Sequence, residues 1–299
     1  VGLHSNPYLN SQDHWDRGFD YYFDGGFEKN SNEFLHSIEN IVTRNQVTTK
    51  IANSLMNFVG THTGKDIRGT GKPYIPAEDL QNRCREVLEN TSEPMFLWMH
   101  HMDVHNPWYP HRGTISEGMN KSEIMKIYFK AKSNPSEVSV KEKEILKKAY
   151  QGSIEYFDRY LQSLISEFHS LLDDPIICIT SDHGELFGES GMFFHPVSVH
   201  PKLLRIPLIF ISKDNPPKQQ APVSTIDILP TLISMSGGSK IPGTDGQNLL
   251  TNSLADRQVF AASGGELRII SAGRHEAYPL SDAENISDLS ESANRYMSQ

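Results

Sequence analysis

The sequence has little cysteine, no long apolar run and no excess of positive charge. Its two cysteines, Cys84 and Cys178, cannot build a disulfide framework. They fall in a helical pattern and in a core strand, as buried free thiols do, which favours a reducing, cytoplasmic compartment. No apolar run reaches about 18 residues, so we expect no membrane span. The formal net charge of −9 argues against a nucleic-acid partner.

The 299 residues are enough for one large α/β domain or for a domain with an appendage. Apolar spacing predicts long helices over residues 76–91 and 141–172 and a shorter one within 47–59. The polar stretch 113–140 is typical of a surface excursion. Apolar and β-branched runs predict strands at residues 1–4, 95–100, 176–180 and 207–211.

Helices and strands alternate along the chain, which predicts an α/β/α sandwich. Its central sheet should be mixed and mostly parallel, with the 176–180 strand in the middle. Residues 1–250 would form this main domain. Short strands with turns after residue 256 suggest that residues 251–299 form a small C-terminal α+β subdomain. No sequence feature indicates an oligomeric state.

A polar run directly follows the buried 176–180 strand and contains the first candidate site. Asp182 and His183 offer one hard oxygen and one imidazole nitrogen to a divalent metal. Ligands bind beyond the carboxyl ends of strands in open α/β sheets, which suits this position. Gly184 would allow a sharp turn behind the pair. Taken alone, an Asp-His dipeptide after a strand is more often a helix cap and a turn residue.

The residues around the pair resemble those of the sulfatase family in the alkaline-phosphatase superfamily. The resemblance is carried by Ser-Asp-His-Gly-Glu, Gly-Glu-x-Gly, His-Pro and Leu-Leu-Arg-Ile-Pro-Leu-Ile between Ser181 and Phe210. It implies that Asp182 and His183 bind the metal and that His195 contacts the sulfate group. Many relatives have His where this chain has Ser190.

A second group of histidines follows the 95–100 strand. The segment around His100, His101 and His105 resembles the family pattern Phe-x-x-x-His-x-x-Asp-x-His-x-Pro-Tyr-x-Pro. The resemblance implies that His105 contacts the substrate oxyanion and gives a proton to the leaving group. His100 matches the first histidine of the pattern. His4 and Asn6 lie where the family has further sulfate contacts, although their motif is not matched residue for residue.

Sulfate-ester hydrolysis needs a nucleophile and a metal besides these contacts. Sulfatases make a formylglycine nucleophile within C/S-x-P-x-R, and neither cysteine and no serine of this chain fits that pattern. We therefore expect an N-terminally truncated chain whose nucleophile segment lies upstream, and which is inactive alone. His105, Asp182, His183 and His195 should converge on one cleft.

Two classes of function remain open on these residues. The first is a metal-dependent sulfuric ester hydrolase acting on a small-molecule or carbohydrate sulfate ester, with Ca²⁺ as the expected metal. On the same scaffold, a phosphodiester or phosphonate monoester hydrolase would use Mn²⁺ or Zn²⁺, and the imidazole of His183 keeps that alternative open. The second class is a non-catalytic, sulfatase-like binding protein.

Overall fold

The computed structural model describes residues 1–6, 8–9, 11–24, 74–91, 94–250, 254, 257–271 and 274–279. The helix predicted within 47–59 lies outside these residues. The chain is mixed α/β and divides into two compact units. The first comprises residues 1–171 with 187–193, and the second comprises residues 172–186 with 194–299. Each unit is described by itself below.

The first unit contains a small parallel sheet of three strands. These are β1 (Gly2–His4), β2 (Tyr22–Phe23) and β3 (Trp98–His100), in the order β2-β1-β3. His4 on β1 is paired with His100 on β3, so both strands end at the same level. Leu3 on the middle strand is fully buried. The predicted strand at 1–4 is confirmed, and the one at 95–100 is shorter than expected.

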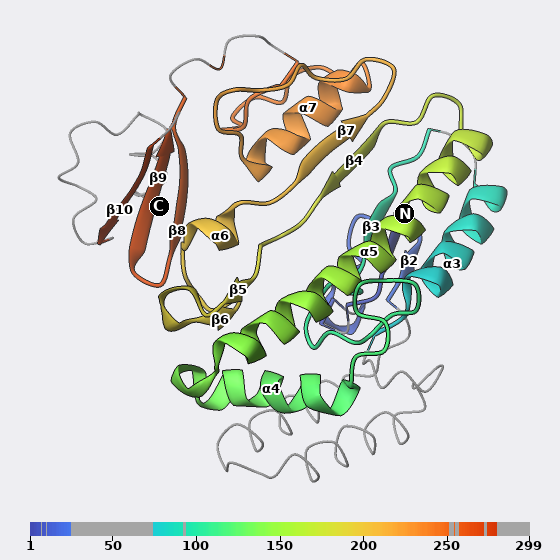
Figure 1. The fold of residues 1–299 in the computed structure, drawn as a ribbon. Coiled ribbons are helices and arrows are strands. Elements are labelled where there is room, and N and C mark those ends of the chain that lie inside the picture. The colour runs from blue at the N-terminus through green and yellow to red at the C-terminus, as the bar shows by residue number, and fades with distance from the viewer. Residues whose placement is uncertain are drawn as a thin grey trace. The chain divides into compact units, whose positions relative to one another are not determined.

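The described part of the first unit also contains the α-helices α3 (Ala77–Asn90), α4 (Lys121–Ser133) and α5 (Val140–Leu171). Both α3 and α4 pack on α5, as Figure 1 shows. The apolar stripe predicted for α3 is the buried one, with Leu80, Cys84, Val87 and Leu88 inside. Short 3-10 turns lie at Ser11–Asp13 and Pro135–Glu137.

The helix α4 was not expected, because residues 113–140 are mostly polar. The prediction of a surface excursion was wrong for the middle of that stretch. Asn120 caps the helix, since its side chain accepts hydrogen bonds from the backbone N–H groups of Ser122 and Glu123. Ile124, Met125, Ile127, Tyr128 and Ala131 are buried at helical spacing. The other eight positions of the helix are half-buried or exposed, and all of them except Phe129 and its neighbours Lys130 and Lys132 are exposed, so the mostly polar sequence hid the five buried ones.

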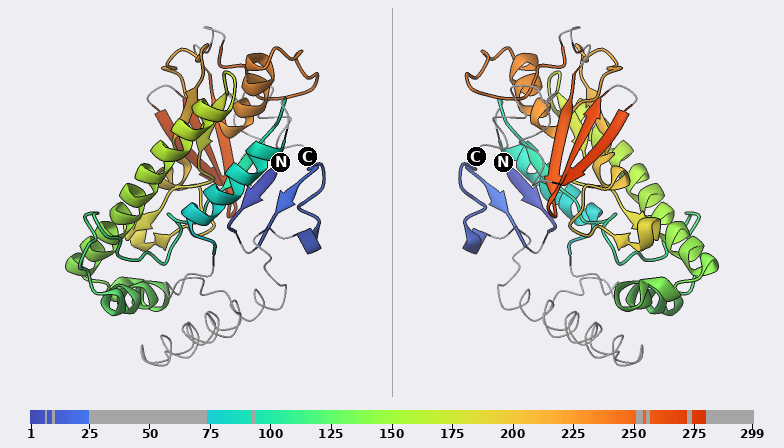
Figure 2. Two further views of the ribbon diagram at one scale, coloured as in Figure 1. Left: turned by 90° about the vertical axis from the view of Figure 1, so that its right-hand side faces the viewer. Right: turned by 90° about the vertical axis from the view of Figure 1, so that its left-hand side faces the viewer.

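The second unit contains two antiparallel sheets. The strands β4 (Ile177–Thr180) and β7 (Leu208–Ile211) pair with each other, and β8 (Val259–Ser263), β9 (Glu266–Ser271) and β10 (Arg274–Pro279) form a meander. Figure 2 shows the three strands of the meander side by side. The antiparallel C-terminal strands expected from the sequence are therefore confirmed.

The second unit also contains α6 (Pro201–Leu204) and α7 (Ile228–Met235), the latter preceded by a 3-10 turn at Thr225–Asp227. A hairpin of β5 (Leu186–Phe187) and β6 (Phe193–Phe194) is divided between the units, because Phe187 to Phe193, with the 3-10 turn at Glu189–Gly191 that closes it, belong to the first. None of the described helices has the length and apolar character needed to cross a lipid bilayer.

The four strands predicted for one sheet are divided between two sheets in the described part of the chain. There β1 and β3 are parallel neighbours, whereas β4 pairs with β7 alone and in antiparallel orientation. The predicted central place of the 176–180 strand is thus not seen. Ile177 to Ile179 are half-buried and Thr180 is exposed. An apolar run reveals that a strand is covered, but it does not encode which strand lies beside it.

A buried ion pair holds the second unit together around Asp227. Its carboxylate has no exposed surface and accepts two hydrogen bonds of 2.6 Å from the guanidinium of Arg257. The backbone N–H groups of Ser224 and Gln247 donate to the same carboxylate at 2.7 and 2.8 Å. Ser224 and Asp227 form a capping box that begins the 3-10 turn before α7.

Replacing Arg257 with leucine should destabilise the protein strongly, because the buried Asp227 carboxylate would lose its charge partner. Breaking such a pair costs about 3–5 kcal/mol. Urea unfolding monitored by circular dichroism would measure the loss. Lys213→Ala, at an exposed position of the same unit, is the matched control and should change stability little. Equal effects of the two substitutions would contradict the prediction.

Two histidines of the first unit are held neutral by burial. Both ring nitrogens of His101 are buried, and its ring lies 5.0 Å from that of Phe157 and 5.6 Å from that of Tyr160. Burial, helped by nearby His100, lowers the pKa of His101 to about 3. Burial also lowers the pKa of His4 to about 4, although Asp24 acts in the opposite direction.

The stability of the first unit should therefore fall in mild acid. The unfolded chain binds the proton of His101 near pH 6.5 and the folded chain only near pH 3, so stability is complete above pH 6.5 and is lost as the pH falls. At pH 5 the loss from His101 alone should be about 2 kcal/mol. Urea titrations at pH 7 and pH 5 would show it. His101→Phe keeps an aromatic ring and should lose less; an identical loss would contradict the assignment.

Candidate functional site

A polar turn begins where β4 ends. Hydrogen bonds fix the chain before and after it. The Thr180 hydroxyl donates to the carbonyl of Pro207 at 2.9 Å, which joins the end of β4 to the start of β7. Four residues later, the N–H of Gly184 donates to the carbonyl of Leu203 in α6 at 2.8 Å. Asp182 and His183 lie between these two anchors, so the turn that carries them is fixed by backbone contacts.

Gly184 is required by a close approach rather than by an unusual turn. Its φ angle is not positive, so a left-handed backbone conformation is not the reason for glycine at the turn expected from the sequence. A Cβ at this position would lie 2.1 Å from the carbonyl oxygen of Lys202. Only a residue without a side chain can lie against α6 in this way.

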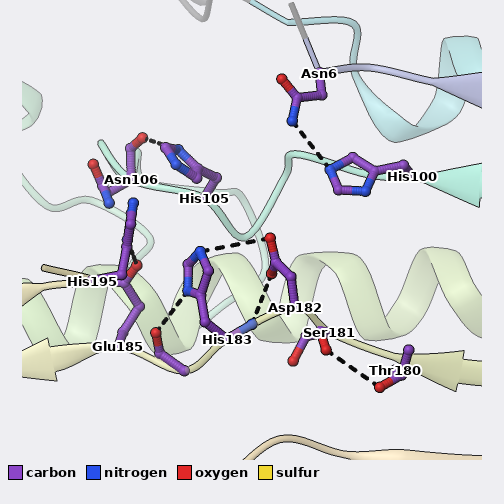
Figure 3. Close-up of polar contacts among 11 residues, drawn as sticks. Asn6, His100, His105, Asn106, Thr180, Ser181, Asp182, His183, Glu185 and His195 are labelled. Atoms are coloured by element: carbon purple, nitrogen blue, oxygen red, sulfur yellow. Dashed lines mark hydrogen bonds and ion pairs between the residues drawn. The ribbon is translucent and has the colours of Figure 1, made fainter. Parts of the chain in front are cut away.

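The carboxylate of Asp182 and the imidazole of His183 are arranged as two neighbouring donors. Oδ1 of Asp182 accepts the backbone N–H of His183 at 2.9 Å, while Oδ2 lies 3.6 Å from Nε2 of the His183 ring (Figure 3). That separation is too long for a hydrogen bond. Two atoms so placed can both lie about 2.0–2.5 Å from one cation. The Asp182 side chain is 69% exposed, so an ion can reach it.

The ring of His183 is held in the tautomer that a metal ligand needs. Its Nδ1 lies 2.9 Å from the carbonyl oxygen of Gly184. A carbonyl only accepts, so Nδ1 carries the hydrogen and Nε2 of the neutral ring keeps its lone pair. The two residues present therefore fit a divalent cation.

His195 is brought back to this turn by the β5–β6 hairpin. Its ring lies on the His183 ring, with 4.3 Å between centroids and 28° between planes. Its Nδ1 lies 2.5 Å from Oε1 of Glu185. Glu185 is 6% exposed and His195 is 30% exposed. The sequence did not single out Glu185, although it stands in the quoted Ser-Asp-His-Gly-Glu run.

In the first unit, the ends of β1 and β3 carry the other polar group. The Asn6 amide nitrogen lies 3.5 Å from Nε2 of His100, and the Ser5 hydroxyl accepts the N–H of Met102 at 2.9 Å. His4 is fully buried against Tyr22, so its ring offers no accessible surface to a ligand in this state.

His105 lies in the loop after β3, which is anchored to the helices. Asp103 is 2% exposed and accepts the N–H of Ala77 at the start of α3, at 3.3 Å. The Trp108 indole donates to the carbonyl of Val104 at 2.8 Å. Nδ1 of His105 lies 2.5 Å from the carbonyl oxygen of Asn106, so Nδ1 carries the hydrogen of the neutral ring.

The structure thus gathers Asp182, His183 and His195 in the second unit, and places Asn6, His100 and His105 on neighbouring segments of the first. Within the second unit the expected clustering is seen. The convergence of His105 on that cluster stays a prediction.

Replacing Gly184 with alanine should destabilise the second unit, because the added methyl group would clash with the Lys202 carbonyl. Overpacking of this kind typically costs about 1–3 kcal/mol. Thermal unfolding would measure it. Ser181→Ala, in the same turn but without such a clash, should leave the midpoint nearly unchanged. If Gly184→Ala unfolded at the same temperature as the Ser181→Ala control, the backbone of the turn would be able to move away from the added methyl group, and the prediction would be wrong.

Comparison with known proteins gives a consistent result. The family model described as Sulfatase matches residues 3–238. The low-salt glycan biosynthesis sulfotransferase Agl7 of Haloferax volcanii is 31% identical over 182 residues, which cover 58% of this chain and 41% of Agl7. A choline-sulfatase of Rhizobium meliloti is 33% identical over 110 residues, covering 35% of this chain and 21% of that enzyme.

A third relative is the phosphoethanolamine transferase EptA of Helicobacter pylori, which is 30% identical over 125 residues. The match covers 41% of this chain and 22% of EptA. The chain thus aligns with less than half the length of each of these relatives. With the family match across residues 3–238 and the Asp-His pair after β4, the chain belongs to the sulfatase family of the alkaline-phosphatase superfamily.

Proposed function

We propose that this chain is the metal-binding part of a sulfuric ester hydrolase that acts on a small-molecule or carbohydrate sulfate ester. The observation that carries the proposal is the Asp182–His183 pair, whose Oδ2 and Nε2 atoms lie 3.6 Å apart with their other polar atoms already hydrogen-bonded. The similarity to a choline-sulfatase supports the substrate class. When bound, the cation would neutralise charge on the ester oxygens.

The roles proposed for the chain's own residues follow from the contacts that orient their side chains. Asp182 and His183 hold the cation. Once its ring is protonated, His105 can donate from Nε2, since Nδ1 is occupied by the Asn106 carbonyl, and so can give a proton to the leaving alcohol. Asn6 and His100 contribute polar contacts beside it. The ring of His195 is stacked on that of His183, and His195 would contact the sulfate group, as the family resemblance implies.

The nucleophile is proposed to be a formylglycine in natural sequence upstream of Val1. No C/S-x-P-x-R motif occurs in the 299 residues. In this proposal residues 1–250 are the catalytic domain, residues 251–299 a C-terminal subdomain, and the central sheet is completed by further strands. This arrangement would leave the present chain able to bind a metal but unable to begin the reaction.

A phosphoester or phosphonate hydrolase is the second candidate. Two observations favour it: an imidazole, from His183, in the metal pair, and similarity to a phosphoethanolamine transferase. Calcium prefers oxygen ligands, whereas zinc and manganese accept imidazole readily. The identity of the nucleophile separates the candidates, because a formylglycine motif would indicate the sulfatase and an unmodified threonine or serine the phosphoester enzyme.

The activity test compares the present chain with the natural longer chain on paired chromogenic aryl sulfate and aryl phosphate esters, with Ca²⁺ or Mn²⁺ added. The present chain should hydrolyse neither ester above background. The longer chain should turn over the sulfate, and His105→Ala should lower its rate by about 10²–10⁴-fold. Asp182→Ala should lower it sharply as well. His275→Ala, on the exposed surface of β10, is the control and should be neutral.

Three outcomes would change the proposal. Turnover by the present chain would place the nucleophile inside it. A preference for the phosphate ester would favour the second candidate. An inactive longer chain with an intact nucleophile would favour a sulfatase-like binding protein.

A further inference from the structure

The meander of β8, β9 and β10 has two faces, and an arginine lies on the face opposite to its apolar core. That core consists of Phe260, Ala262, Leu267, Ile269 and Tyr278. Successive side chains of a strand point to opposite faces, so Arg268 on β9 points away from the core. Its partners across the strands are Ala261 on β8 and Ala277 on β10. These two small side chains leave room for the long side chain of Arg268 between them.

Arg268 is well covered for a charged residue, since its side chain is only 13% exposed. Its Nε donates a hydrogen bond of 2.6 Å to the backbone carbonyl of Val199, a buried residue. Its Nη2 lies 3.2 Å from Oε1 of Glu266, whose side chain is exposed. A hydrogen bond from a charged donor to a covered carbonyl is stronger than an exposed ion pair. The main attachment of Arg268 is therefore the backbone of Val199.

The turn between β8 and β9 contacts the same segment of the chain. Gly264 in this turn has a φ of +61°, and a Cβ there would lie 3.0 Å from the carbonyl oxygen of Val197. The meander thus meets residues 197–199 at two points, through the side chain of Arg268 and through the backbone of Gly264. All of these residues belong to the second unit.

The contacted segment continues directly from His195. Only three residues separate His195 from Val199, and the first of them is Pro196. A proline fixes its own φ angle and restricts the residue before it, so the connection is short and stiff. The Ser198 hydroxyl accepts the N–H of His200 at 3.2 Å, which holds the far end of the segment. A displacement of the backbone at Val199 would therefore be transmitted to His195.

We propose that Arg268 is a positioning residue for His195. By holding the Val199 carbonyl, it fixes the course of the chain that leaves His195. It thereby keeps the His195 ring stacked on the His183 ring, with 4.3 Å between the centroids. The inference rests on the proposed function in taking His195 as the sulfate contact. It gives the C-terminal meander a part in the reaction, although the meander supplies no group that touches the substrate.

Two substitutions separate the hydrogen bond of Arg268 from the bulk of its side chain. Arg268→Gln keeps an N–H donor at the same point along the side chain as the arginine Nε. Arg268→Met has a similar length but no donor. Glu266→Gln removes the ion pair and keeps the bond to Val199, so it is the matched control. Circular dichroism confirms that each variant is folded.

The first measurement is the NMR spectrum of the imidazole rings in the present chain. The His195 signals are assigned by their loss in His195→Gln, and the stacked His183 ring shifts them from the positions of an exposed histidine. In Arg268→Met this shift should shrink, whereas Arg268→Gln and Glu266→Gln should keep it. The signals of His101, in the first unit, should stay unchanged in every variant. A full His195 shift in Arg268→Met would overturn the inference.

The second measurement uses the natural longer chain and an aryl sulfate. Arg268→Met should lower kcat/KM by up to about 10²-fold, because a misplacement of about 1 Å can cost that much. In a chain that carries His195→Ala, the same substitution should have almost no further effect, since no imidazole is left to position. Equal losses in the two backgrounds would show that Arg268 acts independently of His195, and would overturn the inference.

The two measurements also separate this inference from the proposed function. If the longer chain hydrolyses no sulfate ester but Arg268→Met moves the His195 signals, the positioning contact stands and the proposed function fails. If the longer chain is active and Arg268→Met changes neither the His195 signals nor kcat/KM, the positioning contact fails and the proposed function stands.

Discussion

The close approach of the backbone at Gly184 to α6 is the constraint on which the site depends. The N–H of Gly184 is bonded to Leu203, and its Cα has no room for a side chain beside the Lys202 carbonyl. This contact fixes the direction in which the chain leaves β4. Asp182 and His183 precede it and Glu185 follows it, so three polar side chains take their positions from one backbone contact. Rigid support of this kind is what a metal pair of fixed spacing needs.

The spacing of apolar residues predicted helices and strands well wherever the buried side chains lie on one face of the element. The stripe of α3 and the length of α5 could be read from apolar spacing, and so could β4 and the C-terminal strands. The pattern failed for α4, where inward residues are interrupted by lysines and only Asn120 signals the start. It also failed for the partner of β4, because strand pairing is decided by contacts far along the chain.

For the site, too, the sequence predicted what depends on neighbouring residues and missed what depends on contacts far along the chain. Asp182 and His183 are adjacent in sequence, so their proximity required no knowledge of the fold. The return of His195 to His183 depends on the hairpin, and only the family resemblance indicated it. Glu185 was missed because a carboxylate in a turn is usually solvated, whereas here it is 6% exposed. The burial of His4 could not be foreseen either, since it follows from Tyr22 and Trp98 covering the ring.

The hairpin between Glu185 and His195 has a consequence for how such a site can diverge. Its tip, at Glu189–Gly191, lies between Glu185 and His195 along the chain and contains neither of them. A residue gained or lost in the hairpin would therefore move His195 alone and leave the Asp182–His183 pair in place. The position of the His195 imidazole could thus change in a single evolutionary step through the length of one loop, without any substitution of Asp182, His183 or Glu185.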